Sequence, residues 1–212
     1  MIARVTFENE SGVLFNPEEY GIFLVSFDAP APTPKTYTVQ IDGADGELDL
    51  SEWAGEVKYN TRKVDVAFRD MNGILPSPLS QFITGRKLKI CHSDEPDWYY
   101  YGRCVSVMES RRQRVDNQTF TFSCEPYKLA VHETIKTMTV TSSGTIALQA
   151  QRKTCIPTIT VTAACTLGYD SNTYSVAAGT HTLSTFFITE QPKTLTITGS
   201  TGITIKWRDG VL

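Results

Sequence analysis

Short runs in which apolar and polar residues alternate recur along this whole chain. The clearest cover residues 120–124 and 64–68, and similar runs follow at 159–161, 195–197 and 203–207. Successive side chains of a strand point to opposite faces of a sheet, so a period of two predicts half-buried strands. Short strands separated by turns are typical of antiparallel sandwiches and barrels. The pattern therefore predicts an all-β protein.

Only the segment PLSQFITGRK favours a helix. Pro78 suits a first helical turn, Leu79, Phe82 and Ile83 share one face, and Gly85 follows the last turn. We expect a helix of two turns here, embedded in an otherwise β-rich chain.

The composition changes at Glu133. Residues 1–133 carry 14 basic and 20 acidic residues, a formal charge of −6, whereas residues 134–212 carry six basic and three acidic residues, a formal charge of +3. The second stretch also contains 20 threonines, a β-branched residue that suits half-exposed strands. The change predicts two domains, 1–133 and 134–212, the second a small β-sandwich.

The sequence contains no convincing catalytic pattern. The three histidines form no metalloprotease motif, and no phosphate loop or nucleophile elbow occurs. The segment CHSDEPDW, residues 91–98, is either a metal patch or, as we expect, a polar loop between two strands. The five cysteines are odd in number and lack C-x-x-C spacing, which predicts reduced thiols. We expect no enzyme, cofactor or metal; a hydrolase that uses His92 or Asp94 is the disfavoured alternative.

The net charge indicates which partners to expect, and the N-terminal sequence indicates where the protein is made. A net charge of −3 gives no general reason to expect nucleic acid as a ligand. The basic cluster ESRRQR, residues 109–114, is either a phosphate contact or, as we expect, the solvated end of a long hairpin. No apolar run approaches a membrane span, and acidic residues occupy the place of a signal peptide's apolar core. We expect a protein that is made and folded in a cytoplasm.

The segment IDGADGELDLSEWAGEVKYNTR, residues 41–62, concentrates turn residues and acidic charge. Its two Asp-Gly pairs predict a hairpin, because both residue types tolerate positive φ. Calcium-loop spacing does not fit, since carboxylates are missing from the required positions. Two interpretations stay open. In one, the hairpin is an arm that docks Leu48, Leu50 and Trp53 on a neighbouring copy; in the other, Trp53 packs in the chain's own core.

This hairpin and the strand before it resemble the N-terminal domain of siphophage distal tail proteins, the Dit family. The stretches CEPYKLA, residues 124–130, and GITIKWRDGVL at the end of the chain are also similar to that family, so the resemblance spans nearly the whole sequence. Leu50-Ser51 stands near a position where many members have Thr. The matching residues of the first domain are Tyr37, Val39, Ile41, Gly43, Asp45, Gly46, Leu48, Asp49, Tyr59, Asn60 and Arg62.

The resemblance implies a structural protein in the tail tip of a phage or prophage of a Gram-positive host. Family members form a homo-hexameric ring at the distal end of the tail tube. The first domain is a sandwich or barrel-like ring domain with a hairpin arm, and the second is a galectin-like or carbohydrate-module-like β-sandwich. We expect the interface between copies to use Leu48, Leu50, Trp53, Tyr59 and Arg62.

The resemblance also implies partners and a location. The ring joins the tail tube protein to the tail-associated hub or lysin protein, and in some members it holds receptor-binding proteins. DNA passes through the channel without specific binding, and an acidic first domain lining that channel would repel its phosphates. The protein would be part of the virion after assembly in the host cytoplasm, with no membrane contact.

A carbohydrate-binding module that contacts host surface glycans is the alternative function. Sugar sites combine an apolar platform with a few polar groups. The candidate contacts in the second domain are Tyr169 and Tyr174, with Phe186 and Phe187 nearby, but acidic and amide partners are sparse around them.

Overall fold

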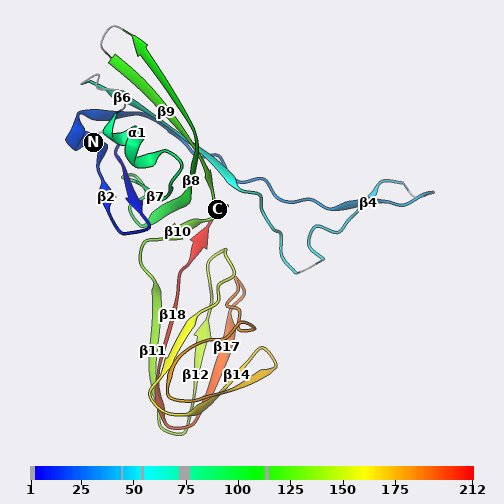
Figure 1. Ribbon diagram of the computed structural model, residues 1–212. Coiled ribbons are helices and arrows are strands. Elements are labelled where there is room, and N and C mark those ends of the chain that lie inside the picture. The colour runs from blue at the N-terminus through cyan, green and yellow to red at the C-terminus, as the bar shows by residue number, and fades with distance from the viewer. Residues whose placement is uncertain (1–2, 44, 54, 72–76, 113–114) are drawn as a thin grey trace. The chain divides into compact units, whose positions relative to one another are not determined.

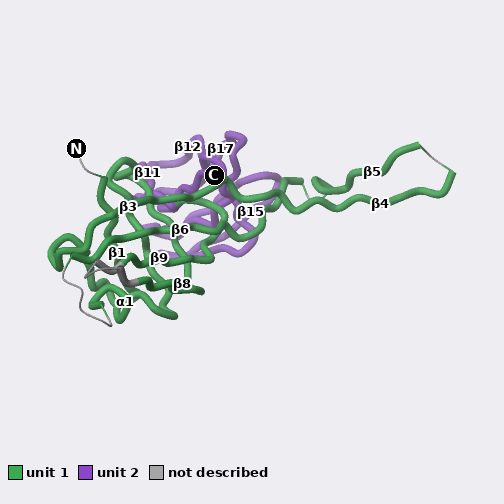
Figure 2. The backbone as a smooth tube through the Cα atoms, turned by 90° about the horizontal axis from the view of Figure 1, so that it is seen from above, with its two compact units in different colours: residues 1–128, 212 green, residues 129–211 purple. Residues whose placement is uncertain are grey.

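The computed structural model describes residues 3–43, 45–53, 55–71, 77–112 and 115–212. The chain divides into two compact units, unit 1 with residues 1–128 and 212 and unit 2 with residues 129–211 (Figure 2). Antiparallel strands dominate both, and the described residues contain one α-helix and one 3-10 helix. The predicted all-β class with one short helix is therefore confirmed.

Unit 1 is built on a large antiparallel sheet (Figure 1). Its strands lie in the order β2-β1-β7-β8-β9-β6-β3. Their bounds are β1 Val5–Asn9, β2 Leu14–Phe15, β3 Ile22–Asp28, β6 Arg62–Asp70, β7 Lys87–His92, β8 Trp98–Arg112 and β9 Val115–Cys124. A separate two-stranded sheet pairs β4 Thr38–Gln40 with β5 Glu47–Asp49, and the 3-10 helix η1 spans Pro17–Tyr20.

The core of unit 1 follows the predicted alternation. On β6, Val64 and Val66 are fully buried, and they lie opposite Phe122 and Phe120 of β9, which are also fully buried. The ring centroid of Phe7 on β1 lies 5.8 Å from that of Phe122. Aromatic pairs at this separation add to the free energy gained by burying apolar area.

The predicted helix is confirmed as α1, Pro78–Ile83. Ser77 caps its first turn, because the Ser77 Oγ accepts a hydrogen bond of 3.0 Å from the Ser80 amide. The same hydroxyl donates to Oε1 of buried Gln118 on β9 at 2.8 Å, which ties the start of the helix to the sheet. Leu79 and Ile83 are fully buried in the core of unit 1.

Unit 2 contains two four-stranded sheets, β11-β18-β13-β16 and β12-β17-β14-β15. One core takes fully buried side chains from both, such as Ile159 and Ile205 from the first and Leu167 and Leu195 from the second, so unit 2 is a β-sandwich. The strands are β11 Thr134–Val140, β12 Ser143–Leu148, β13 Thr158–Val161, β14 Cys165–Tyr169, β15 Asn172–Val176, β16 Gly179–Thr182, β17 Lys193–Thr198 and β18 Thr201–Trp207. The chain also forms the short strands β10 Lys128–Ala130 and β19 Gly210–Val211.

Many threonines of unit 2 occupy outward positions on its strands, although Thr201 of β18 is buried. Thr137, Thr204, Thr160 and Thr180 lie in register across the first sheet, and the residues that alternate with them, such as Ile159, point into the core. This placement explains why threonine is so frequent there, since it suits a pleated surface that faces water on one side.

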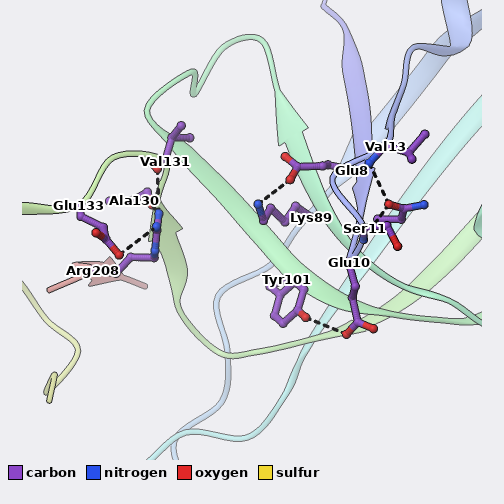
Figure 3. A network of polar contacts seen from close by, with 11 residues as sticks. Glu8, Glu10, Ser11, Val13, Lys89, Tyr101, Ala130, Val131, Glu133 and Arg208 are labelled. Carbon is purple, nitrogen blue, oxygen red and sulfur yellow. Dashed lines mark hydrogen bonds and ion pairs between the residues drawn. The ribbon is translucent and has the colours of Figure 1, made fainter. Parts of the chain in front are cut away.

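Arg208 holds the two ends of unit 2 together. Its Nη1 donates to the carbonyl oxygens of Ala130 and Val131 at 2.6 and 2.8 Å, and its Nη2 lies 3.4 Å from Glu133 (Figure 3). The change in composition at Glu133 thus falls just inside unit 2, which begins at Leu129. The separate roles of the two predicted domains stay a prediction.

Candidate interaction surface

Residues 33–60 form a long excursion from the strands of unit 1, here called the arm (Figure 2). Its outer part is the hairpin of β4 and β5, in which Val39 lies opposite Leu48. Among the described residues of the arm, none belongs to the buried core of unit 1. The predicted hairpin is therefore present, and it lies outside that core.

Main-chain hydrogen bonds close the base of the arm into a stem. The Lys35 amide donates to the Lys58 carbonyl at 2.7 Å, and the Asn60 amide donates to the Thr33 carbonyl at 2.9 Å. The Asn60 side chain also donates to the Thr33 hydroxyl at 3.1 Å. The stem fixes where the arm leaves unit 1 without using any side chain of the core.

One face of the arm hairpin is apolar. Strand alternation places Tyr37, Val39 and Ile41 on the same face, with Leu48 opposite Val39 and Leu50 donating its amide to the Tyr37 carbonyl at 2.8 Å. Tyr37 is 62% exposed and Leu48 is 49% exposed. A two-stranded hairpin is marginally stable alone in water, so an apolar face of this kind gains most from a second surface.

The part of the arm beyond the stem, residues 36–57, is acidic. Residues 36–57 contain no lysine or arginine, and their carboxylates are Asp42, Asp45, Glu47, Asp49, Glu52 and Glu56. Asp49 accepts hydrogen bonds from the Ser51 hydroxyl at 2.5 Å and from the Ser51 amide at 2.8 Å. These bonds lower the pKa of Asp49, so it stays ionised in mildly acidic solution.

Trp53 is 85% exposed, which rules out the interpretation in which it packs in the chain's own core. It sits in a turn in which its amide donates to the Leu50 carbonyl at 3.1 Å and the Gly55 amide donates to the Glu52 carbonyl at 2.7 Å. Gly55 has a φ of 93°, a conformation that favours glycine. The docking of Trp53 on a neighbouring copy stays a prediction.

Arg62 and Tyr59 differ from the arm residues. Arg62 is 3% exposed, and its guanidinium carbon lies 5.4 Å from the ring centroid of Tyr100. A buried guanidinium offers no surface to another copy, so the structure does not support the predicted interface role of Arg62. Tyr59 is half-buried, and its ring lies edge-on to that of Tyr127, with the ring centroids 5.9 Å apart.

The segment 91–98 contains the end of β7, the start of β8 and the polar loop of residues 93–97 that joins them. Glu95 accepts hydrogen bonds from Lys128 Nζ at 2.6 Å and from the Tyr100 hydroxyl at 3.1 Å. Burial raises the pKa of Glu95, but the hydrogen bonds from Lys128 and Tyr100 and the charges of Lys128 and His92 together outweigh it, so the net pKa is lowered. Burial and the Glu95 charge raise the pKa of Tyr100 to about 12. Among the described residues, no three metal-ligating side chains gather, and His92 packs its ring 4.7 Å from that of Phe27.

All five cysteines are free thiols, as predicted. Burial raises the pKa of Cys124 to about 12 and that of Cys155 to about 11. Because the thiolate is the reactive form, these raised pKa values make both groups inert at neutral pH.

The predicted sugar contacts do not form an open platform. Tyr169 is 3% exposed, its ring stacks on that of Phe186 at 4.1 Å, and its hydroxyl donates to the Phe187 carbonyl at 3.2 Å. Tyr174 is half-buried and donates to the Thr185 carbonyl at 3.2 Å. A ring buried like that of Tyr169 belongs to the sandwich core and has no face for a sugar.

The basic cluster ESRRQR falls partly outside the described residues. Gln113 and Arg114 are not described, and the described backbone up to Arg112 belongs to β8, whose partner β9 begins at Val115. Its proposed position at the end of a long hairpin fits these bounds, and its freedom from phosphate contacts stays a prediction. In the part of the chain that the structure describes, no helix has the length and apolarity of a membrane span.

Comparison with known proteins gives one consistent result. Neither a protein-family model nor a curated protein sequence matches the chain. Among solved structures, the Dit protein (gp 19.1) of phage SPP1 superposes with a TM-score of 0.68 over 100% of both chains, at 16% identity. The chain has the Dit fold. That protein is described as a paradigm of the hub adsorption apparatus in phages that infect Gram-positive bacteria.

Two further structures are similar to this chain, and both come from the baseplate of phage P2. The activated conformation with calcium gives a TM-score of 0.53 at 7% identity, covering 100% of this chain and 99% of the other. The activated conformation with strontium gives 0.52 at 6% identity, covering 97% and 98%. The predicted resemblance to distal tail proteins is therefore confirmed at the level of the fold.

Proposed function

We propose that this chain is a structural component of a phage tail tip that assembles into a homo-hexameric ring at the distal end of the tail tube. The observation that carries the proposal is the arm, whose apolar face and Trp53 lie exposed outside the core of a chain with the Dit fold. Exposed apolar surface of this kind marks a contact with another protein.

In the proposed ring, each copy places its arm on the next copy. Such a contact is head-to-tail, because the arm and the surface that receives it are different parts of the same chain, and rotation closes the contacts into a ring. Unit 1 builds the annulus, and unit 2 serves as a scaffold sandwich. The proposed function depends on shape and requires no turnover.

The ring would connect the tail tube protein to the tail-associated hub or lysin protein, with receptor-binding proteins as further partners. DNA would pass through its channel without specific binding. The formal charge of −6 on residues 1–133 suits this role, because an acidic wall repels phosphates. The protein would be part of the virion after assembly in the host cytoplasm.

Size-exclusion chromatography with light scattering, followed by negative-stain electron microscopy, tests the proposal. We expect a mass of six chains at high protein concentration and particles with six-fold symmetry in the micrographs. Solitary particles of monomer mass at every concentration would rule out the ring.

A further inference from the structure

Two cations lie directly opposite each other on the outward face of the sheet of unit 1. Lys87 of β7 is in register with Arg103 of β8. Leu88 and Gly102, their neighbours along the strands, are buried, so both charged side chains point away from the core. Like charges at directly opposite positions of neighbouring strands destabilise a sheet. A bound anion would remove this cost.

Carboxylates of the chain offset only part of this charge. Lys87 Nζ lies 3.9 Å from Glu125, so that carboxylate partly balances Lys87. Within the ranges that the structure describes, neither Arg103 nor neighbouring Arg86 forms an ion pair. Two guanidinium groups therefore keep an unbalanced positive charge beside a third cation.

Neutral groups hold both arginines in place. The guanidinium carbon of Arg86 lies 5.8 Å from the ring centroid of Phe82, and Arg103 Nη1 donates to the Gly85 carbonyl at 2.6 Å. Both arginines are exposed, and the rest of their N–H groups can donate to a ligand. Side chains that are already held lose little conformational entropy when a ligand binds.

The three cations line a hollow of about 340 Å³ beside the turn that follows β1, here called the basic hollow. The Asn9 carboxamide oxygen accepts hydrogen bonds from the Ser11 amide at 3.0 Å and from the Val13 amide at 2.9 Å, which fixes the turn and leaves the Asn9 NH2 group to donate. Ser11 lines the hollow too and adds a hydroxyl. Glu10 is the carboxylate of the wall, and it accepts a hydrogen bond of 3.1 Å from the Tyr101 hydroxyl (Figure 3).

We propose that the basic hollow is an anion site that binds a phosphate group with three free oxygens, either inorganic phosphate or the monoester of a sugar or polyol. A phosphate monoester carries a charge of about −1.5 to −2 at pH 7 and three strong acceptor oxygens, whereas a carboxylate offers two oxygens and one charge. Two arginines, a lysine and two neutral donors therefore match phosphate better than carboxylate. The inference goes beyond the proposed function and does not depend on the ring.

Titration calorimetry with inorganic phosphate and with glycerol 1-phosphate, in chloride buffer at constant ionic strength, tests the site on the intact chain. We expect both anions to bind the wild type. Arg103→Gln should weaken binding about tenfold, because charge-assisted hydrogen bonds to phosphate are lost, and adding Arg86→Gln should weaken it further. Lys206→Gln removes a charge from an exposed lysine of unit 2 and should bind as the wild type does. Tighter binding of glycerol 1-phosphate would support an organic phosphate as the ligand, and equal binding would support free phosphate.

Three results would overturn the phosphate site. The first is that neither anion binds the wild type, and the second is that Arg103→Gln binds them as tightly as the wild type does. The third is equal binding of succinate, which would mean a general anion surface such as one for an acidic peptide. Thermal melting shows whether each variant folds, and Arg103→Gln alone decides if the double variant unfolds. Light scattering on the same samples reports the oligomeric state, so a failure of the proposed ring is seen separately.

Discussion

The arm and unit 2 are both built from antiparallel strands, but unit 2 buries its apolar faces whereas the arm leaves its apolar face exposed. Both consist of antiparallel strands with alternating side chains, but in unit 2 two sheets cover each other's apolar faces and leave threonines outside. In the arm, Leu48 and Tyr37 remain exposed on a single hairpin. Alternation therefore determines which face is apolar, whereas the number of layers that the chain itself supplies determines whether that face needs a partner.

Removal of the arm tests the contrast between the arm and unit 2 most directly, and we expect it to have the largest effect. Residues 36–57 can be replaced by a short Gly-Ser linker, because the hydrogen bond of 2.7 Å from the Lys35 amide to the Lys58 carbonyl already closes the stem. We expect complete loss of the ring with a nearly unchanged melting temperature, since the core of unit 1 uses no arm residue. Light scattering and circular dichroism measure the two effects, and a large drop in melting temperature would mean that the arm also stabilises its own chain.

A core truncation in unit 2 should have the converse effect. Phe186 is fully buried against Tyr169, so Phe186→Ala should lower the free energy of unfolding by about 3–5 kcal/mol. Below the new melting temperature, ring formation should persist, because the arm is in unit 1. Urea unfolding gives the first quantity; a cost below about 1 kcal/mol would contradict the described core.

Trp53→Ala tests the same contrast between folding and association at a single side chain. An exposed tryptophan contributes little to folding, so the free energy of unfolding should change by less than about 0.5 kcal/mol. If Trp53 docks as an interface anchor, association should weaken by about 2 kcal/mol, roughly 30-fold. Phe187→Ala, an exposed aromatic truncation in unit 2, is the control in sedimentation equilibrium, and equal association of both variants would remove Trp53 from the interface.

The smallest effect concerns the Glu95 network in unit 1. Tyr100→Phe removes the hydrogen bond to Glu95 and should cost about 1 kcal/mol at pH 7. The pKa of Tyr100 is raised to about 12, above the usual 10, so the folded state retains a proton that the unfolded state loses. The stability from this group is intact below pH 10 and declines as the pH rises toward 12. Urea unfolding at pH 7, 10 and 11 should show a smaller alkaline decline in the variant; identical profiles would exclude this cause.

The strands and the helix could be predicted because their signals are local. Alternation identified β6 and β9, and a proline, an apolar face and a following glycine identified α1, whereas its capping Ser77 was not predicted. The same alternation also carried information that the site predictions missed. Arg62 is two residues before buried Val64, and Tyr169 is two residues after buried Leu167, so both fall on the inward side of their strands.

The aromatic stack of Phe15 with Tyr20 and Phe82 could not be predicted in this way. Phe15 and Phe82 are far apart in the sequence, and only the folded chain brings β2 and α1 together. A single sequence contains no local pattern for that juxtaposition. The exposure of Trp53 was equally inaccessible, because a tryptophan in a turn is compatible with either a buried or an open position.

The stem gives the arm an independence that matters for how such chains diversify. Because Thr33 and Lys35 are joined to Asn60 and Lys58 through main-chain atoms, whatever lies beyond them can lengthen, shorten or change its side chains while the fold of the subunit is retained. Insertions near Asp42 and Gly46 can then change the length of the arm and the protein that it contacts, while the stem stays the same.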